Sequence, residues 1–221
     1  MTIPIRVALV DDQSLFRGGI RMLVGSQPDL EVCGEASDGR EAVDLAVSTH
    51  PDVILMDIRM PVMDGIEATK AILAGAARRG EEPPRILVLT TFDLDEAAAT
   101  AIRSGASGFV LKDAEPEFLL AAIRTVHAGN AVIAASATRE LFAHFDSRPE
   151  APAVPERYRS LTSREQEIFL LAASGLSNSE IAAKEFLSEA TVKTHISRIF
   201  GKLEVRDRVQ LVVFAFEHGL V

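Results

Sequence analysis

Residues 53–65 read VILMDIRMPVMDG, and this stretch decides the fold. Val53–Met56 is apolar without polar alternation, which is typical of a strand that is buried on both faces of a parallel sheet. Asp57 follows it directly, and Asp64 and Gly65 precede a helical pattern that extends to Ala77. The stretch therefore predicts a strand, a loop with an aspartate at its start, and a helix.

The same unit recurs on both sides of this stretch. Five strand-and-helix repeats within about 125 residues predict a doubly wound α/β domain with a five-stranded parallel sheet. The predicted strands are Ile5–Val10, Leu30–Ala36, Val53–Met56, Ile86–Leu89 and Gly108–Leu111. The predicted helices are Leu15–Val24, Gly39–Ser48, Gly65–Ala77, Asp95–Ser104 and Pro116–Ala128.

Composition narrows the class of protein. The 221 residues are 48% hydrophobic and 25% charged, enough apolar residues for a sizeable core. No apolar run approaches the roughly 18 residues of a membrane span, and the N-terminus does not resemble a secretory signal. The single cysteine, Cys33, excludes an intramolecular disulfide framework and a cysteine-based zinc cluster. We expect a soluble, cytoplasmic protein without a membrane partner.

The charge is distributed unevenly. The net charge is −9 for the whole chain, but it is −8 for residues 1–129, 0 for residues 130–159 and −1 for residues 160–221. The whole-chain value argues against nucleic-acid binding, whereas the nearly neutral C-terminal part leaves room for a local basic patch.

Polar residues follow four of the predicted strands. Asp11 and Asp12 come after the first strand, Asp57 after the third, Thr90 after the fourth and Lys112 after the fifth. Because the carboxyl ends of parallel strands share one edge of the sheet, these side chains are expected to converge. Clustered carboxylates suit Mg²⁺, an aspartate can attack phosphorus, and a lysine can offset phosphoryl charge. Turn formation and helix capping remain the alternative for any one of these residues.

Four segments carry a resemblance over nearly all of residues 5–129: ALVDDQSLFRGGI, DVILMDIRMPVMDGIEAT, ILVLTTFD and GASGFVLKD. They resemble the receiver domain of two-component response regulators, which has a flavodoxin-like fold. The resemblance implies Asp57 as phospho-acceptor, a metal site formed by Asp11, Asp12, Asp57 and the backbone carbonyl of Arg59, Thr90 as the hydroxyl that follows the phosphoryl group, Lys112 as its ion-pair partner, and Phe109 as the aromatic switch residue.

The C-terminal part predicts a helix-turn-helix. Residues 130–159 are interpreted as a linker with one possible short helix, Ser136–Phe145, and the second domain as residues 160–221. Thr162 with Glu165 and Ser177 with Glu180 form the pattern of two capping boxes. Short and long helices separated by a tight turn then follow, at residues 179–185 and 189–203.

The two faces of the helix at residues 189–203 differ. Val192, Ile196, Ile199 and Leu203 have the spacing of a core stripe. The opposite face has small polar residues and lysines at its flanks, and five bases against two acids lie between residues 193 and 208. A solvated helix face would explain the lysines. The low profile of the face instead favours a helix that enters a DNA groove and meets phosphates.

Residues 160–221 resemble the LuxR-type DNA-binding domain in LTSREQEIFLLAASGLSNSEIA and LSEATVKTHISRIFGKLEVRDRVQ. The whole chain is therefore similar to the NarL/FixJ family of response regulators. Glu185 at a usually apolar position and Glu204 in place of a helix-ending glycine depart from the pattern. The resemblance implies base-facing roles for Lys193, Thr194 and Ser197, phosphate contacts for Asn178, Ser188, Thr191, Arg198, Lys202 and Arg206, and pairing of two copies through Asp207–His218.

The resemblance implies a bacterial regulator of transcription. A sensor histidine kinase would phosphorylate Asp57 with Mg²⁺, and the phosphorylated homodimer would bind a two-fold operator in double-stranded DNA. The chain would have only self-phosphorylation and self-dephosphorylation chemistry, so it would not be an enzyme. Two alternatives are an Mg²⁺-dependent phosphohydrolase, disfavoured by the helix-turn-helix, and a DNA-binding protein with a degenerate receiver scaffold, disfavoured by the intact set of five polar residues.

Overall fold

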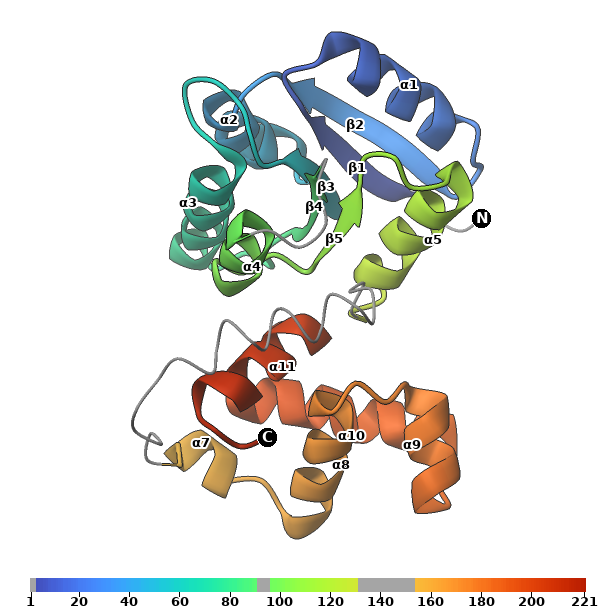
Figure 1. Cartoon of the computed structure of the whole chain (residues 1–221), viewed down its shortest axis with the longest axis vertical. Helices are drawn as coiled ribbons and strands as arrows, with labels where there is room; N and C mark the ends of the chain where they lie inside the picture. The colour runs from blue at the N-terminus through green and yellow to red at the C-terminus, as the bar shows by residue number, and fades with distance from the viewer. Residues whose placement is uncertain (1–2, 91–95, 131–153) are drawn as a thin grey trace. The chain divides into compact units, whose positions relative to one another are not determined.

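The structure, a computed structural model, describes residues 3–90, 96–130 and 154–221 (Figure 1). The chain forms two compact units, which we describe one at a time. The predicted helix Ser136–Phe145 lies outside the described residues. Within the described ranges, every helix is too short or too polar to cross a membrane.

The N-terminal unit contains a five-stranded parallel sheet, which confirms the predicted fold class. The strand order is β2-β1-β3-β4-β5, so the chain reverses its direction of winding after β1. The crevice beyond the carboxyl ends of β1 and β3 is therefore the expected position of a functional site. The strands are β1 (Ile5–Val10), β2 (Leu30–Ala36), β3 (Val53–Asp57), β4 (Arg85–Thr90) and β5 (Gly108–Leu111).

Helices cover both faces of this sheet (Figure 1). One face packs against α1 and α5, where Leu55 and Leu87 of the central strands meet Ile123. The central strands are buried on both faces, in agreement with their continuous apolar sequence. The helices are α1 (Ser14–Gly25), α2 (Gly39–Thr49), α3 (Gly65–Arg79), α4 (Glu96–Arg103) and α5 (Pro116–His127).

Gly65 brings α3 against the end of β3. Its amide donates a hydrogen bond to the carbonyl of Ile58 at 2.9 Å. A Cβ atom on Gly65 would lie 2.0 Å from the carbonyl oxygen of Asp57, so a side chain cannot fit there without displacing the backbone. The glycine therefore lets the first turn of α3 support the loop that carries Asp57.

The C-terminal unit is helical, with the two predicted capping boxes present at Thr162 and Ser177. Its core includes Phe169, Ile181 and the predicted stripe on α10 from Val192 to Leu203. Ser188 caps α10 by accepting a hydrogen bond from the Thr191 amide. The helices are α7 (Glu156–Arg159), α8 (Ser163–Ala173), α9 (Asn178–Glu185), α10 (Glu189–Leu203) and α11 (Arg208–Glu217).

The C-terminal unit begins before residue 160, where the sequence interpretation placed the end of the linker. Pro155 precedes α7, and Tyr158 in this one-turn helix packs edge-on against Phe169, with ring centroids 5.1 Å apart. A single helical turn has no apolar period of its own. It becomes ordered because the Tyr158 ring is half-buried against the core of α8 and its neighbours.

Candidate functional site

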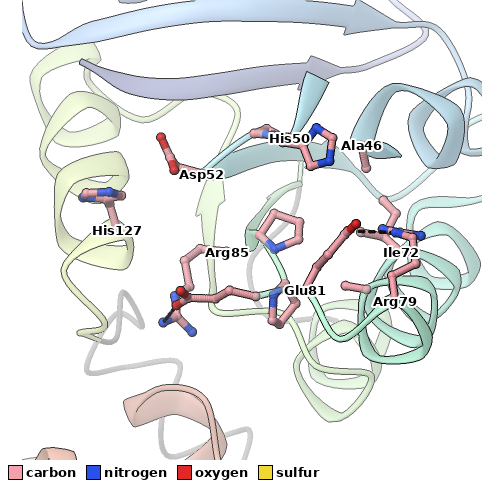
Figure 2. Close-up of a pocket in the computed structure, with 13 residues that line it drawn as sticks. Ala46, His50, Asp52, Ile72, Arg79, Glu81, Arg85 and His127 are labelled. Atoms are coloured by element: carbon pink, nitrogen blue, oxygen red, sulfur yellow. Dashed lines mark hydrogen bonds and ion pairs between the residues drawn. The ribbon is translucent and has the colours of Figure 1, made fainter. Parts of the chain in front are cut away.

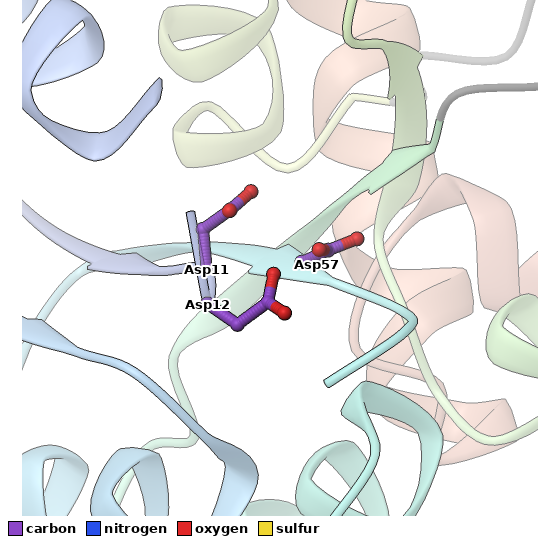
Figure 3. A group of neighbouring side chains, drawn as sticks. All are labelled: Asp11, Asp12 and Asp57. Atoms are coloured by element: carbon purple, nitrogen blue, oxygen red, sulfur yellow. The ribbon is translucent and has the colours of Figure 1, made fainter. Parts of the chain in front are cut away.

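Three carboxylates meet beyond the ends of β1 and β3 (Figure 3). Asp11, Asp12 and Asp57 each offer an oxygen atom, and these atoms all lie within 4.8 Å of one another. Asp11 and Asp57 are buried, with 2% and 5% of their surface exposed, whereas Asp12 is exposed. The parallel strands thus bring together residues that are more than 40 positions apart in the sequence.

Lys112 bridges two of these carboxylates from the end of β5. Its Nζ lies 2.6 Å from Asp11 Oδ2 and 2.8 Å from Asp57 Oδ2. The backbone amide of Lys112 donates to the carbonyl of Thr90 at 2.7 Å, which anchors the lysine to the end of β4. The ammonium group is therefore held by both its backbone and its ion pairs.

Burial and neighbouring charges change the acidity of this cluster. Burial raises the pKa of Asp57, and the adjacent Asp11 acts in the same direction, while Lys112 opposes both. Burial by itself would lower the pKa of Lys112, but its hydrogen bonds to Asp11 and Asp57 outweigh burial and raise that pKa. The lysine is thus fully charged at neutral pH and stabilises the two carboxylates.

The donor set fits a small divalent cation. Three carboxylates and one ammonium group leave two negative charges without compensation, which is the charge that Mg²⁺ would balance. Oxygen ligands with one exposed side, at Asp12, also match an ion that retains several of its waters. Asp11, Asp12 and Asp57 are the side chains that would hold it.

The other expected receiver residues lie on β4, on β5 and in the loop after β3. Thr90 ends β4 and is 5% exposed, and Phe109 in β5 is 6% exposed, so both lie in the interior. The backbone amide of Arg59 points to Asp57, with a nitrogen-to-Oδ1 distance of 3.4 Å. The loop that contains Arg59 therefore packs back onto the Asp57 carboxylate.

In the C-terminal unit, α10 presents the predicted polar face. Lys193, Thr194, Ser197 and Arg198 are exposed, while the stripe that includes Val192 and Leu203 is buried. The Thr194 hydroxyl donates to the carbonyl of Ala190 at 2.9 Å, which leaves its oxygen able to accept. The exposed face of this helix therefore combines the cationic groups of Lys193 and Arg198 with small side chains, Thr194 and Ser197, that can donate or accept hydrogen bonds.

The residues expected at DNA phosphates have different surroundings. Ser188 and Thr191 lie at the start of α10, with their hydroxyl oxygens 2.8 Å apart, and Arg198 is exposed. The other three contact groups within the unit. Lys202 Nζ lies 2.6 Å from Glu165 Oε2, Arg206 Nε lies 3.3 Å from Asp207 Oδ2, and Asn178 Oδ1 accepts a hydrogen bond from Arg208 at 3.2 Å.

Comparison with known protein families agrees with both sites. The profile of the response regulator receiver domain matches residues 7–124, and that of the luxR family of bacterial regulatory proteins matches residues 159–215. This chain is a response regulator. It belongs to the regulators that join a receiver domain to a LuxR-type DNA-binding domain and control transcription.

Relatives align with the response regulator over almost its whole length. The uncharacterized transcriptional regulatory protein YxjL of Bacillus subtilis is 43% identical over 98% of this chain and 97% of the relative. The transcriptional regulatory protein LiaR of the same organism is 42% identical over 98% and 99%, respectively. The response regulator protein VraR of Staphylococcus aureus is 39% identical over 98% and 99%.

Solved structures show the same fold. The response regulator ChrA of a heme-sensing two-component system shares 35% identity, with a TM-score of 0.50 and coverage of 99% of both chains. The receiver domain of the putative response regulator NarL from Mycobacterium tuberculosis also shares 35% identity. Its TM-score is 0.52, with 57% of this chain and 98% of that chain covered.

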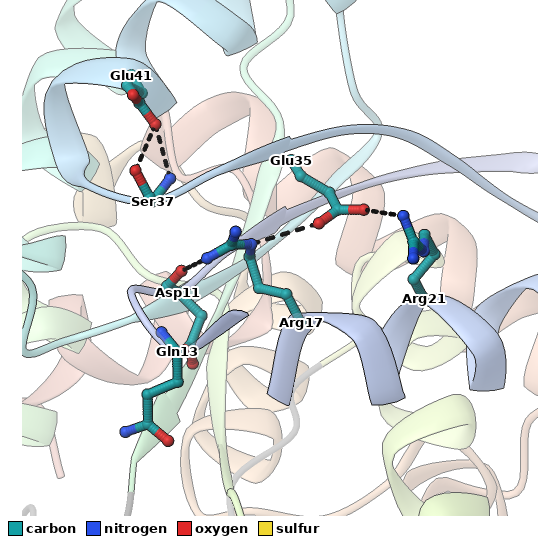
Figure 4. Close-up of polar contacts among 7 residues, drawn as sticks. All are labelled: Asp11, Gln13, Arg17, Arg21, Glu35, Ser37 and Glu41. Atoms are coloured by element: carbon teal, nitrogen blue, oxygen red, sulfur yellow. Dashed lines mark hydrogen bonds and ion pairs between the residues drawn. The ribbon is translucent and has the colours of Figure 1, made fainter. Parts of the chain in front are cut away.

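The receiver site of the response regulator includes an arginine that the sequence reasoning missed. Arg17 in α1 donates from Nη1 to the backbone carbonyl of Asp11, and its Nε lies 3.3 Å from Glu35 (Figure 4). Arg21 lies 3.2 Å from the other oxygen of Glu35. The network ties the turn after β1, and hence Asp11, to α1 and β2. An arginine five residues after an acidic pair is only a weak signal in a sequence.

Phe16 is a second residue that the sequence reasoning missed. The ammonium group of Lys112 lies 4.9 Å from the centroid of the Phe16 ring. A cation over an aromatic face is stabilised by the ring quadrupole. Phe16 therefore covers the side of the lysine that faces α1.

A separate cavity of about 320 Å³ lies at the opposite edge of the sheet (Figure 2). Asp52, which precedes β3, and Arg85, which begins β4, line it together with His127 of α5. Arg79 in its wall is paired with Glu81 at 2.7 Å. Because Asp57 lies at the carboxyl ends of the strands, this cavity is distinct from the carboxylate cluster.

Proposed function

We propose that Asp57 accepts a phosphoryl group from a histidine of a partner sensor kinase, and that Mg²⁺ is the cofactor. The observation that carries this proposal is the cluster of Asp11, Asp12 and Asp57 with Lys112 placed on two of its members. The backbone carbonyl of Arg59 would add a further metal ligand. A bound Mg²⁺ would offset the negative charge of the transferring phosphoryl group.

The chain's own groups have distinct roles in this transfer. An oxygen of Asp57 attacks phosphorus, the phosphorus–nitrogen bond of the phosphohistidine breaks, and the histidine leaves with that electron pair and takes up a proton. Lys112 then pairs with the new acyl phosphate, and the Thr90 hydroxyl donates to one of its oxygens. Phe109 packs inward after Thr90 and so changes the receiver surface. The protein is thereby its own substrate and does not turn over another one.

The second part of the proposal concerns DNA. Phosphorylation favours a homodimer through the receiver, and the dimer binds a two-fold operator in the cytoplasm, where chromosomal DNA is found. Lys193, Thr194 and Ser197 read base edges in the major groove. Two copies are needed because each α10 contributes few cations, so one half-site binds weakly. The phosphates contact the following residues: Asn178, Ser188, Thr191, Arg198, Lys202 and Arg206.

Intact-mass measurement tests the phosphoryl transfer. Treatment with a small phosphodonor and Mg²⁺ is expected to add one phosphoryl group to the protein, and chelation of Mg²⁺ should abolish the addition. Asp57→Ala is expected to lose it completely. Asp44→Asn, which changes an exposed aspartate of α2, is the control and should retain it. Unchanged phosphorylation of the Asp57 variant would exclude this acceptor.

Selection from random DNA tests the regulation. Duplexes selected by the phosphorylated protein are expected to contain two inverted half-sites and to bind the unphosphorylated protein much more weakly. Lys193→Ala should weaken binding in both states. Equal affinities of both states, with both states monomeric in ultracentrifugation, would contradict the proposed switch.

A further inference from the structure

Arg208 is a buried cation whose three hydrogen-bond acceptors among the described residues are uncharged oxygens. It lies at the start of α11 and is 8% exposed. Its Nη1 donates to Asn178 Oδ1 at 3.2 Å, and its Nη2 donates to the carbonyls of Ala172, at 3.3 Å, and Leu176. Burial lowers the pKa of the guanidinium group, and the charge of Glu180 opposes this effect.

These three acceptors lie in the segment that runs from the end of α8 to the start of α9. Ala172 lies in the last turn of α8, Leu176 lies in the connection between the two helices, and Asn178 is the first residue of α9. The planar, forked guanidinium can serve several acceptors at once, which a lysine ammonium group cannot match in geometry. Arg208 thus links α11 to the start of the helix-turn-helix through three contacts.

The hydrogen bond to Asn178 also determines which way its amide points. An asparagine side chain carries one oxygen acceptor and one NH₂ donor on opposite sides of the same carbon. When Oδ1 accepts from Arg208, Nδ2 must point away from Arg208. Asn178 is half-buried, and no hydrogen bond within the described part of the chain uses Nδ2, so this donor is left for a partner outside the unit.

We propose that Arg208 is a positioning residue for DNA binding: it orients the Asn178 amide so that Nδ2 donates to a DNA phosphate. This inference rests on the proposed phosphate contact of Asn178. It also makes α11 part of the DNA-binding arrangement, because the arginine that sets the amide belongs to that helix. Without Arg208, the amide can rotate and the α8–α9 connection loses three hydrogen bonds.

The test uses the full-length phosphorylated protein and a duplex selected from random DNA by the wild type. A series of duplexes replaces one phosphate at a time with a neutral methylphosphonate, which removes the charged oxygen acceptor. Several phosphates in each half-site are expected to matter for the wild type, and replacement of the one that Asn178 contacts is expected to lower the affinity about tenfold. Asn178→Ala and Arg208→Lys should bind the unmodified duplex more weakly than the wild type, and replacement of that phosphate should no longer change their affinity. The double variant should bind no more weakly than whichever of the two single variants has the lower affinity.

Two further variants separate orientation from general stability. Asn178→Asp retains an acceptor for Arg208 but has no donor, so we expect a higher melting temperature together with weaker DNA binding. Arg157→Lys is the matched control, since Arg157 is also an arginine of the C-terminal unit but pairs with Glu204, at 3.1 Å, rather than with Asn178. It should respond to the methylphosphonate series as the wild type does.

The outcomes are distinguishable. Arg208→Lys that keeps the wild-type response, while Asn178→Ala loses it, would overturn the positioning role. A wild-type response in Asn178→Ala, or wild-type affinity in Asn178→Asp, would overturn the phosphate contact itself. If Arg208→Lys does not fold, the two Asn178 variants decide the result. Failure of the wild type to select or bind any duplex would instead contradict the proposed function.

Discussion

Two lysines are held by buried carboxylates, Lys112 in the N-terminal unit and Lys202 in the C-terminal unit. Lys112 is shared by Asp11 and Asp57, with Asp12 nearby, so acid is in excess. Within the described residues, the one carboxylate that Lys202 meets is that of Glu165, whose Oε2 also accepts from the amide and hydroxyl of Thr162. The first cluster has uncompensated negative charge that suits a cation, whereas in the second cluster the one lysine balances the one glutamate. Charge excess, rather than burial alone, distinguishes the Lys112 cluster from the Lys202 cluster.

Removal of Lys112 is expected to have the largest effect. Lys112→Met leaves two buried carboxylates side by side, so the free energy of unfolding of the N-terminal unit should fall by about 3 kcal/mol without divalent ions. Mg²⁺ should restore much of the loss, because it would replace the missing positive charge. Circular dichroism during urea unfolding, with and without Mg²⁺, measures both effects.

Lys70→Met is the control for this experiment, since Lys70 is an exposed lysine in the same unit. It should change stability by less than about 0.5 kcal/mol and leave the response to Mg²⁺ unaltered. A Lys112→Met protein that Mg²⁺ fails to stabilise would contradict the charge argument.

The corresponding lysine in the C-terminal unit should matter less. Lys202→Met is expected to destabilise that unit by about 1–2 kcal/mol at neutral pH, because Glu165 retains its Thr162 donors. Mg²⁺ should have no effect there. Tyr158, the single tyrosine of a chain without tryptophan, packs on Phe169, so tyrosine fluorescence reports unfolding of this unit alone.

The same pair predicts a dependence on pH. Burial acts to raise the pKa of Glu165, but the hydrogen bonds from Lys202 and Thr162 outweigh it and lower that pKa. The stabilisation is therefore complete above the unfolded pKa of about 4.3 and is lost as pH falls through the lower folded pKa. Lys202→Met should show a smaller loss in acid. An equal loss in both proteins would assign the acid sensitivity to other carboxyl groups.

Backbone strain gives the smallest expected effect, and it lies in the loop after Asp57. Val62 has a φ of 66°, and its side chain is 83% exposed. The residues on either side of it are joined by a hydrogen bond, in which the Met63 amide donates to the Pro61 carbonyl at 2.7 Å. A β-branched residue is strained in this region, so Val62→Gly should stabilise the N-terminal unit by about 0.5–1 kcal/mol. Val47→Gly, in the last turn of α2, should have the opposite sign. Destabilisation by Val62→Gly would show that the side chain has a contact that outweighs the strain.

Local patterns predicted most elements, because buried residues recur with the period of each element and capping residues mark where a helix begins. The strand Ile5–Val10 and the helix Glu189–Leu203 have the predicted bounds, since a continuous apolar run and a stripe from Val192 to Leu203 encode them. Strand ends also predicted that the aspartates would share one edge. The one-turn helix at Tyr158 was missed, because its order depends on Phe169 rather than on a local period.

The two glutamates that depart from the LuxR-type pattern show what local sequence cannot supply. Glu185 occupies a usually apolar position, and it pairs with Arg164 of α8, 21 residues away, by both a side-chain and a backbone contact. Glu204 adopts a left-handed conformation, with φ of 57°, where a glycine is common, and Arg157 lies 3.1 Å from it. Each departure has a partner that only the packing of the helices reveals.

The sequence by itself determined the two folds, the carboxylates at the strand ends and the polar face of α10, since each follows from a pattern among residues that are close along the chain. Only the tertiary structure decided that Lys112 bridges Asp11 and Asp57, and that Arg208 directs the Asn178 amide across 30 positions. Such contacts depend on how elements pack, and the direction of a side chain depends on neighbours from other elements. The sequence therefore tells where a charged residue stands, but the fold decides which residue it pairs with and so what role it has.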